Sequence, residues 1–117
     1  MKKVKNEHIV LRNGEETIEL DYTDLRKAVL VLRAINHELR QQIISLLEEH
    51  ERLTVTEIYI KLRLEQSVAS QHLAILRKAG IVQPDRQGKF IYYSLARDRM
   101  GQIAQLVENL SENPLSQ

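Results

Sequence analysis

The chain has 117 residues, of which 43% are hydrophobic and 28% charged, and it contains no cysteine. This length suits one domain, and the composition is typical of a folded protein rather than a disordered one. The lack of cysteine excludes disulfides, thiolate metal sites and thiol-based catalysis or redox sensing. No apolar run is long enough for a membrane helix or a secretory signal, so we expect a cytoplasmic protein without a membrane partner.

The net charge of +1 conceals a segregation of charge along the chain. Residues 61–99 carry eight basic and three acidic side chains, a net +5, so the remainder carries −4. A basic segment in an otherwise near-neutral protein indicates local contact with a polyanion such as nucleic acid. A solvated run of charges explains the same numbers, and charge alone does not decide between the two.

The chain begins with a predicted arm, residues 1–22. Asn13 and Gly14 lie between two runs that contain apolar residues, within residues 8–20. Asn-Gly tolerates the positive φ of tight hairpin turns, so this pair predicts a short β-hairpin. The alternative is that the pair simply ends an ordered arm.

Two helices are predicted next, over 24–35 and 38–50. Apolar residues recur every three or four positions in the first helix, at Leu25, Ala28, Val29, Leu32 and Ile35. The second repeats Leu39, Ile43, Leu46 and Leu47 in the same way. Asn36 interrupts the period and is the residue expected to cap the second helix.

A helix-turn-helix unit follows. Thr54 and Glu57 have the spacing of a capping box, which predicts a short helix over 55–62. A three-residue break separates it from a helix over 66–79, and Gly80 suits the left-handed position after that helix. A short helix, a three-residue turn and a second helix are typical of the helix-turn-helix.

Two strands, over 81–86 and 90–95, are expected to join through Gln87–Gly88, with Pro84 favouring an edge position. A last helix over 96–111 precedes a frayed end at 112–117, which contains Pro114. A hairpin directly after a helix-turn-helix makes a winged helix. We therefore predict a mainly α fold with a small β-hairpin wing, formed by residues 23–111.

The helix over 66–79 has two distinct faces. Ala69, Leu73 and Leu76 fall on one side, and small polar residues with one cation fall opposite. Small side chains let a helix backbone sit deep in the major groove of DNA, and Gln71 presents the donor and acceptor that adenine pairs with. An ordinary surface helix is the competing interpretation. The predicted DNA contacts are Gln66, Ser67, Ser70, Gln71, His72, Arg77, Lys78, Arg86, Gln87 and Lys89.

Four of these candidates have an alternative. Arg86 and Lys89 at the wing tip suit phosphate or minor-groove contact, but cations also solubilise any exposed hairpin. Arg77 suits a backbone phosphate, or it pairs with Asp85 or Glu65. His72 borders the apolar side of its helix, which favours a packed, hydrogen-bonded histidine over a direct DNA contact. His37 similarly fits a residue at a helix start better than a ligand.

Three segments resemble the ArsR/SmtB-type repressors. Residues 66–82 read QSVASQHLAILRKAGIV and match the recognition-helix pattern Q-S-x-V/A-S-x-H-L-x-x-L-R-x-A-G-L/I-V. Residues 86–95 match the wing pattern R-x-G-R/K-x-x-Y-Y-x-L, and residues 36–40 match H-P-x-R apart from Glu38 at the proline.

The resemblance covers about residues 25–97 and implies a homodimeric transcription factor that usually represses. Two recognition helices in a dimer predict double-stranded DNA with an imperfect inverted repeat as the partner. In such proteins the first and last helices form the dimer. The implied interface residues are Leu25, Val29, Leu32, Met100, Ile103, Val107 and Leu110.

The chain departs from the metal sensors of that family. Their Cys-x-Cys motif corresponds here to Leu53–Glu57, and no histidine follows Asp98 to form their second type of site. We therefore predict no metal site and no cofactor, and the sequence does not identify an effector. No arrangement of catalytic residues or nucleotide-binding motif is present, so an enzyme is not expected. The alternative function is a winged helix that docks protein or RNA.

Overall fold

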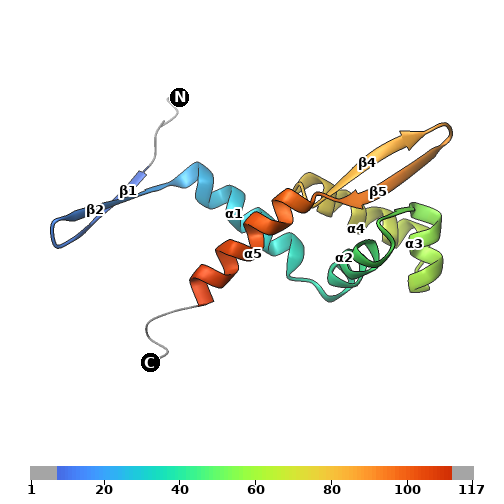
Figure 1. Ribbon diagram of the computed structural model, residues 1–117, viewed down its shortest axis with the longest axis horizontal. Coiled ribbons are helices and arrows are strands. Elements are labelled where there is room, and N and C mark those ends of the chain that lie inside the picture. The colour runs from blue at the N-terminus through green and yellow to red at the C-terminus, as the bar shows by residue number, and fades with distance from the viewer. Residues whose placement is uncertain (1–7, 112–117) are drawn as a thin grey trace.

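The computed structural model describes residues 8–111, so the predicted frayed end at 112–117 lies outside it. Helices dominate, and the predicted winged helix-turn-helix is confirmed (Figure 1). The elements are β1 (His8–Asn13), β2 (Glu16–Asp21), α1 (Tyr22–Ile35), α2 (Glu38–His50), β3 (Arg52–Thr54), α3 (Val55–Leu62), α4 (Gln66–Lys78), β4 (Val82–Gln87), β5 (Phe90–Leu95) and α5 (Arg97–Ser111). None of the helices within residues 8–111 is both long and apolar enough to cross a membrane.

One hydrophobic core lies among α2, α3, α4 and the base of the wing. α1 contributes Val31 and Ala34 to it, which lie beside the apolar stripe predicted for that helix rather than in it. α5 contributes Ile103. The largest fully buried side chains are Ile43, Leu47, Ile58, Leu73, Leu76 and Ile81.

The wing belongs to a three-stranded antiparallel sheet in the order β3-β5-β4. Pro84 lies in the edge strand, as predicted, and its cross-strand neighbour is Tyr93. β3 was not predicted, because three residues are too few to show alternation. Its Leu53 pairs with Tyr93 and is buried.

Both hairpins turn one residue later than predicted. The two-residue turns are Gly14–Glu15 and Gly88–Lys89, and Asn13 instead pairs with Glu16 in the strands. Only the glycine in each turn has positive φ, +70° and +64°. This is the requirement of a type II′ turn, which places glycine first.

The helix ends follow local hydrogen-bonding chemistry. The capping box is confirmed, with Glu57 N–H donating to Thr54 Oγ1 at 3.2 Å and Thr54 N–H donating to the Glu57 carboxylate at 2.9 Å. Gly80 has the predicted left-handed conformation, φ +78°. The prediction that Asn36 caps α2 was wrong. Asn36 ends α1, and His37 Nδ1 accepts from Leu39 N–H at 3.1 Å, because His37 is the residue with extended backbone.

Candidate DNA interface

The helix-turn-helix places α4 with one face buried and one free. Arg63 ends α3 in the left-handed conformation at φ +58°, and Leu64 N–H closes the turn on Tyr59 C=O at 2.8 Å. α4 then packs Ala69, Leu73 and Leu76 into the core, as predicted. The opposite face of α4 is therefore held outward by the burial of these three residues.

The outward face of α4 has the composition predicted for it. Each of its members is exposed, and only the lysine is long: Ser67, Ser70, Gln71, Ala74 and Lys78. At the start of α4, the Glu65 side chain makes no capping hydrogen bond, and the first turn has no acidic residue. Val68 N–H donates to Glu65 C=O at 3.1 Å, which leaves the N–H groups of Gln66 and Ser67 available to an anion such as a phosphate.

A hollow beside this face gathers groups that suit a phosphate. It lies between α4 and β5 and is lined by Val55, Ser70, Ala74, Arg77, Lys78 and Tyr93. Arg77 is exposed, and among residues 8–111 it forms neither of the ion pairs considered for it. Asp85 instead lies 3.9 Å from Arg52 Nη1 and accepts a hydrogen bond from Gln87 Nε2 at 2.9 Å.

The wing carries cations at its tip and along its side. Arg86 and Lys89 are exposed, with Lys89 Nζ 5.8 Å from the centre of the Phe90 ring. Arg52 stacks on the Tyr92 ring at 4.2 Å and so adds a cation that sequence reasoning missed. The pairing of β3 with β5 brings it there, and no sequence signal indicated that pairing.

His72 is half-buried between α4 and the start of α2. Arg40 Nη1 lies 3.2 Å from its Nδ1, and the His37 ring lies 4.7 Å from its ring centre to centre. Burial, with help from His37 and Arg40, lowers the pKa of His72 below its ordinary value. These contacts favour the packed histidine, and a direct DNA contact stays a prediction.

Arg40 is a positioning residue that sequence reasoning did not single out. Besides His72, its guanidinium donates to Ala34 C=O at 2.6 Å and to Arg33 C=O at 3.3 Å. A cation at the end of a helix satisfies its last carbonyls and its dipole. Arg40 thus links the end of α1 to α4, and its only signal was its place in the matched segment 36–40.

Comparisons with known proteins agree with this geometry. Residues 37–83 match the model of the bacterial regulatory protein, arsR family. The transcriptional activator HlyU of Vibrio cholerae is 37% identical over 84 residues, 72% of this chain and 77% of HlyU. The chain belongs to the ArsR family. It is a DNA-binding transcriptional regulator with the winged helix-turn-helix fold.

Two further similar proteins have solved structures. The transcriptional repressor PagR of Bacillus anthracis is 34% identical, and its crystal structure has a TM-score of 0.63, covering 74% of this chain and 99% of PagR. A possible ArsR-family regulator from Mycobacterium bovis, described as homodimeric, has a TM-score of 0.67 at 26% identity. That match covers 80% of this chain and 86% of the other.

The interface residues implied for an ArsR dimer fall into three groups. Leu25, Val29, Val107 and Leu110 are exposed. Leu32 and Met100 are half-buried, and Ile103 packs into the core of its own protomer. Beside them, a groove between α1 and α5 is lined by Lys27, Ala28, Val31, Leu32, Arg99, Gln102, Ile103 and Leu106.

The described part of this ArsR-family chain offers no evident metal centre. Among residues 8–111, no three His, Asp or Glu side chains gather closely enough to hold a metal ion. His37 and His72 come together, but Arg40 lies beside them and opposes a further positive charge. The lack of metal sensing stays a prediction.

Proposed function

We propose that this regulator is a repressor that binds duplex DNA as a homodimer, with α4 in the major groove. The exposed face of α4, small and polar and bordered by Arg77 and Lys78, is the observation that carries the proposal. A face of this kind admits the helix backbone close to base edges. The same face on a merely solvated helix would carry long charged side chains.

The side chains divide into those that contact bases and those that contact phosphates. Gln71 lies in the middle of the outward face and makes the base-specific contact, supported by Ser67 and Ser70. Arg77 and Lys78 contact phosphates from the hollow beside α4, and the wing tip adds sequence-independent attraction. Reading and anchoring therefore depend on different residues.

The homodimer forms through α1 and α5. Leu25 and Val29 on α1 and Val107 and Leu110 on α5 are apolar and exposed, although each helix buries other residues. The homodimeric relative from Mycobacterium bovis supports this arrangement. Two copies of α4 about 34–36 Å apart then require an imperfect inverted repeat as operator.

Repression follows when such a dimer occupies a promoter and excludes the polymerase. PagR is named a repressor and HlyU an activator, so the direction needs its own measurement. With the operator placed over the promoter, transcription in vitro is expected to fall as purified protein is added. A rise in transcript would show an activator.

The direct test begins with selection of genomic fragments bound by the purified protein. Gln71→Ala is then expected to lose about 1–3 kcal/mol of operator binding while binding to scrambled duplex stays nearly constant. Gln42→Ala, an exposed glutamine on α2, is the matched control. If Gln71→Ala behaves like that control, α4 does not read the sequence.

The alternative, docking to RNA or protein, predicts a different competition result. Folded RNA would then displace the operator as effectively as unlabelled operator duplex does. For a DNA-binding repressor, we expect operator duplex to compete far better than RNA of equal charge.

A further inference from the structure

The hairpin of β1 and β2 has one apolar face. Side chains of directly paired residues point to the same side of a two-stranded sheet, and successive pairs alternate between sides. One face therefore carries Leu11 opposite Ile18 and Ile9 opposite Leu20. Leu11 is 47% and Ile18 41% exposed, whereas Ile9 and Leu20 are half-buried. The other face carries His8, Val10, Arg12, Thr17, Glu19 and Asp21.

Within residues 8–111, the protomer leaves much of this apolar face exposed. The hairpin extends from the start of α1, at the end of the molecule opposite the wing (Figure 1). Among residues 8–111 no third strand pairs with it, and none of its own residues is buried. A lone two-stranded hairpin is marginal in water, so an ordered one with an apolar face implies a second surface against it.

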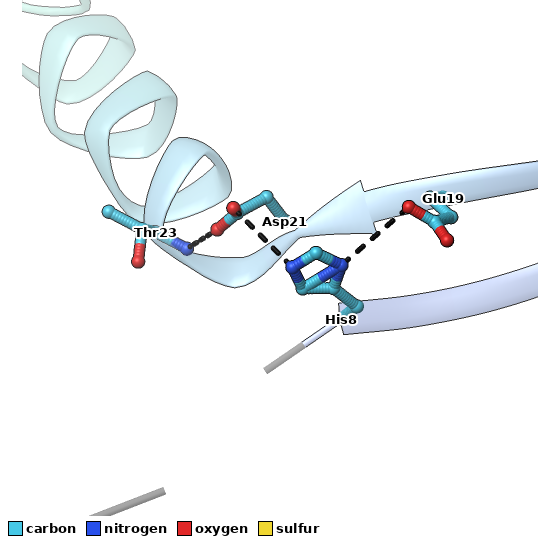
Figure 2. Close-up of polar contacts among 4 residues, drawn as sticks. All are labelled: His8, Glu19, Asp21 and Thr23. Carbon is cyan, nitrogen blue, oxygen red and sulfur yellow. Dashed lines mark hydrogen bonds and ion pairs between the residues drawn. The ribbon is translucent and has the colours of Figure 1, made fainter. Parts of the chain in front are cut away.

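The hairpin is joined to α1 without a linker. β2 ends at Asp21, and Asp21 Oδ1 accepts from Thr23 N–H at 2.7 Å to cap α1. On the polar face, His8 Nε2 lies 3.6 Å from Asp21 Oδ2, and His8 Nδ1 lies 3.8 Å from Glu19 Oε1 (Figure 2). The Thr23 N–H, foremost among several contacts, lowers the pKa of Asp21 and keeps this cap charged. The hairpin therefore continues directly from α1, the helix proposed for the dimer interface.

Charge favours a second copy of this chain as that partner. Residues 8–21 carry one arginine and four carboxylates, and residues 22–35 of α1 carry three cations and one carboxylate. The groove between α1 and α5 is apolar inside and has Lys27 and Arg99 among its lining residues. Glu16 lies on the same side of the hairpin as Leu11 and Ile18, at the tip. An apolar strip that ends in one carboxylate at its tip, Glu16, therefore complements an apolar groove bordered by Lys27 and Arg99.

We propose that β1 and β2 form a dimerisation arm whose apolar face packs on the α1–α5 surface of a second copy. The contact is reciprocal, because a two-fold dimer repeats each contact in both directions. The inference rests on the proposed homodimer and extends it. It assigns Leu11 and Ile18 to the interface and leaves Val10, on the opposite face, outside it.

Two variants of the full chain test the apolar face. Leu11→Ser combined with Ile18→Ser is expected to raise the dimer dissociation constant about tenfold or more, measured by sedimentation equilibrium. The matched control is Val10→Ser, which removes an apolar side chain that is 52% exposed on the other face. It is expected to change the constant less than about twofold. Equal effects of the two changes on the dissociation constant would overturn the proposed dimerisation arm.

Cross-linking gives an independent readout that does not depend on stability. The chain has no cysteine, so Asn13→Cys and Gln102→Cys each introduce one thiol. Asn13 lies at the tip of the apolar face, and Gln102 lines the α1–α5 groove. A bismaleimide added to the mixed variants is expected to join one chain of each kind. Arg12→Cys, on the polar face, is expected to join poorly, and equal yields would contradict the proposal.

A third variant separates failure of the arm from failure of the dimer. Val107→Asp, on α5, is expected to weaken both dimer and operator binding. If wild-type protein sediments as a monomer at micromolar concentration, the proposed dimer and the arm both fail. If Val107→Asp dissociates the dimer and the arm variants leave it intact, the dimer stands and the arm alone is overturned.

Discussion

The two β-hairpins of this regulator share a backbone plan and differ in how they are held. Each has two six-residue strands and a two-residue turn that glycine begins with positive φ. The wing gains a third strand, β3, and buries Val82 and Leu95 at its base. In the described part of the chain, the N-terminal hairpin has neither a third strand nor a buried residue. Local turn chemistry thus forms both hairpins, but only the wing is held against the hydrophobic core.

Their charges differ as well. Residues 82–95 of the wing carry two cations and one carboxylate, whereas residues 8–21 carry one cation and four carboxylates. A cationic hairpin suits a polyanion, and an acidic amphipathic one suits a basic protein surface. The same structural unit therefore suits two kinds of partner, according to its side chains.

Replacing one apolar residue in each hairpin is expected to give the largest difference, and that difference is in the free energy of unfolding. Leu95→Ala empties a buried site in the wing base and is expected to cost about 2–5 kcal/mol of the free energy of unfolding. Leu11→Ala in the exposed hairpin is expected to stay within about 0.5 kcal/mol. Both changes are made in Val107→Asp protein, at a concentration where sedimentation shows a monomer, so that urea unfolding excludes any effect of the dimer. Equal losses would show that both hairpins are anchored alike.

Removing cations from each hairpin tests whether the wing contacts DNA and the N-terminal hairpin does not. Arg86→Ala with Lys89→Ala is expected to weaken operator and scrambled duplex alike, because these cations release counterions rather than read bases. The slope of log K against log salt should flatten by about one to two units per protomer. Arg12→Ala, which removes an exposed cation from the N-terminal hairpin, should leave that slope unchanged. Loss of operator binding alone would mean that the wing reads sequence.

Mild acid is expected to lower the free energy of unfolding of the winged-helix domain through His72. His8 in the hairpin faces two carboxylates, whereas His72 is half-buried beside Arg40 and His37. Because the pKa of His72 is lowered by folding, the unfolded chain binds a proton more readily. The contribution of His72 to the free energy of unfolding is complete above its ordinary pKa near 6.5. It declines as the pH falls through that value toward the lowered pKa of the folded state. Unfolding free energies measured from pH 7.5 to 5.5 should show this decline.

His72→Asn is the matched variant for that experiment. Its amide oxygen can accept from Arg40 as Nδ1 does, but it does not titrate. The part of the pH dependence due to His72 should therefore disappear in this variant. An unchanged profile would assign the decline to other groups.

Zinc is expected to have the smallest effect. Thiolates are absent from the chain, and no suitable ligand group gathers among residues 8–111. Operator affinity should thus change less than tenfold, about 1.4 kcal/mol, at stoichiometric zinc. A larger shift would direct attention to His37, which lies beside His72, and to His50.

Much of the fold could be predicted because its signals are local. The capping box at Thr54, the apolar period of each helix and Gly80 depend on residues within one or two helical turns. The outward face of α4 followed from helical geometry alone, since Leu73 and Leu76 define the side that is buried. The matched segments predicted membership of the ArsR family, and the comparisons confirmed it.

Other features required the tertiary structure, because each joins residues that are far apart in the chain. β3 exists only by pairing with β5, and Arg40 has its role only because α1 ends and α4 passes beside it. Periodicity identified α1 as apolar but not which side faces its own core, since nearly every side of that helix carries apolar residues. The packing of α2 and α4 decided that Val31 and Ala34 are buried and that Leu25 and Val29 stay free for a partner.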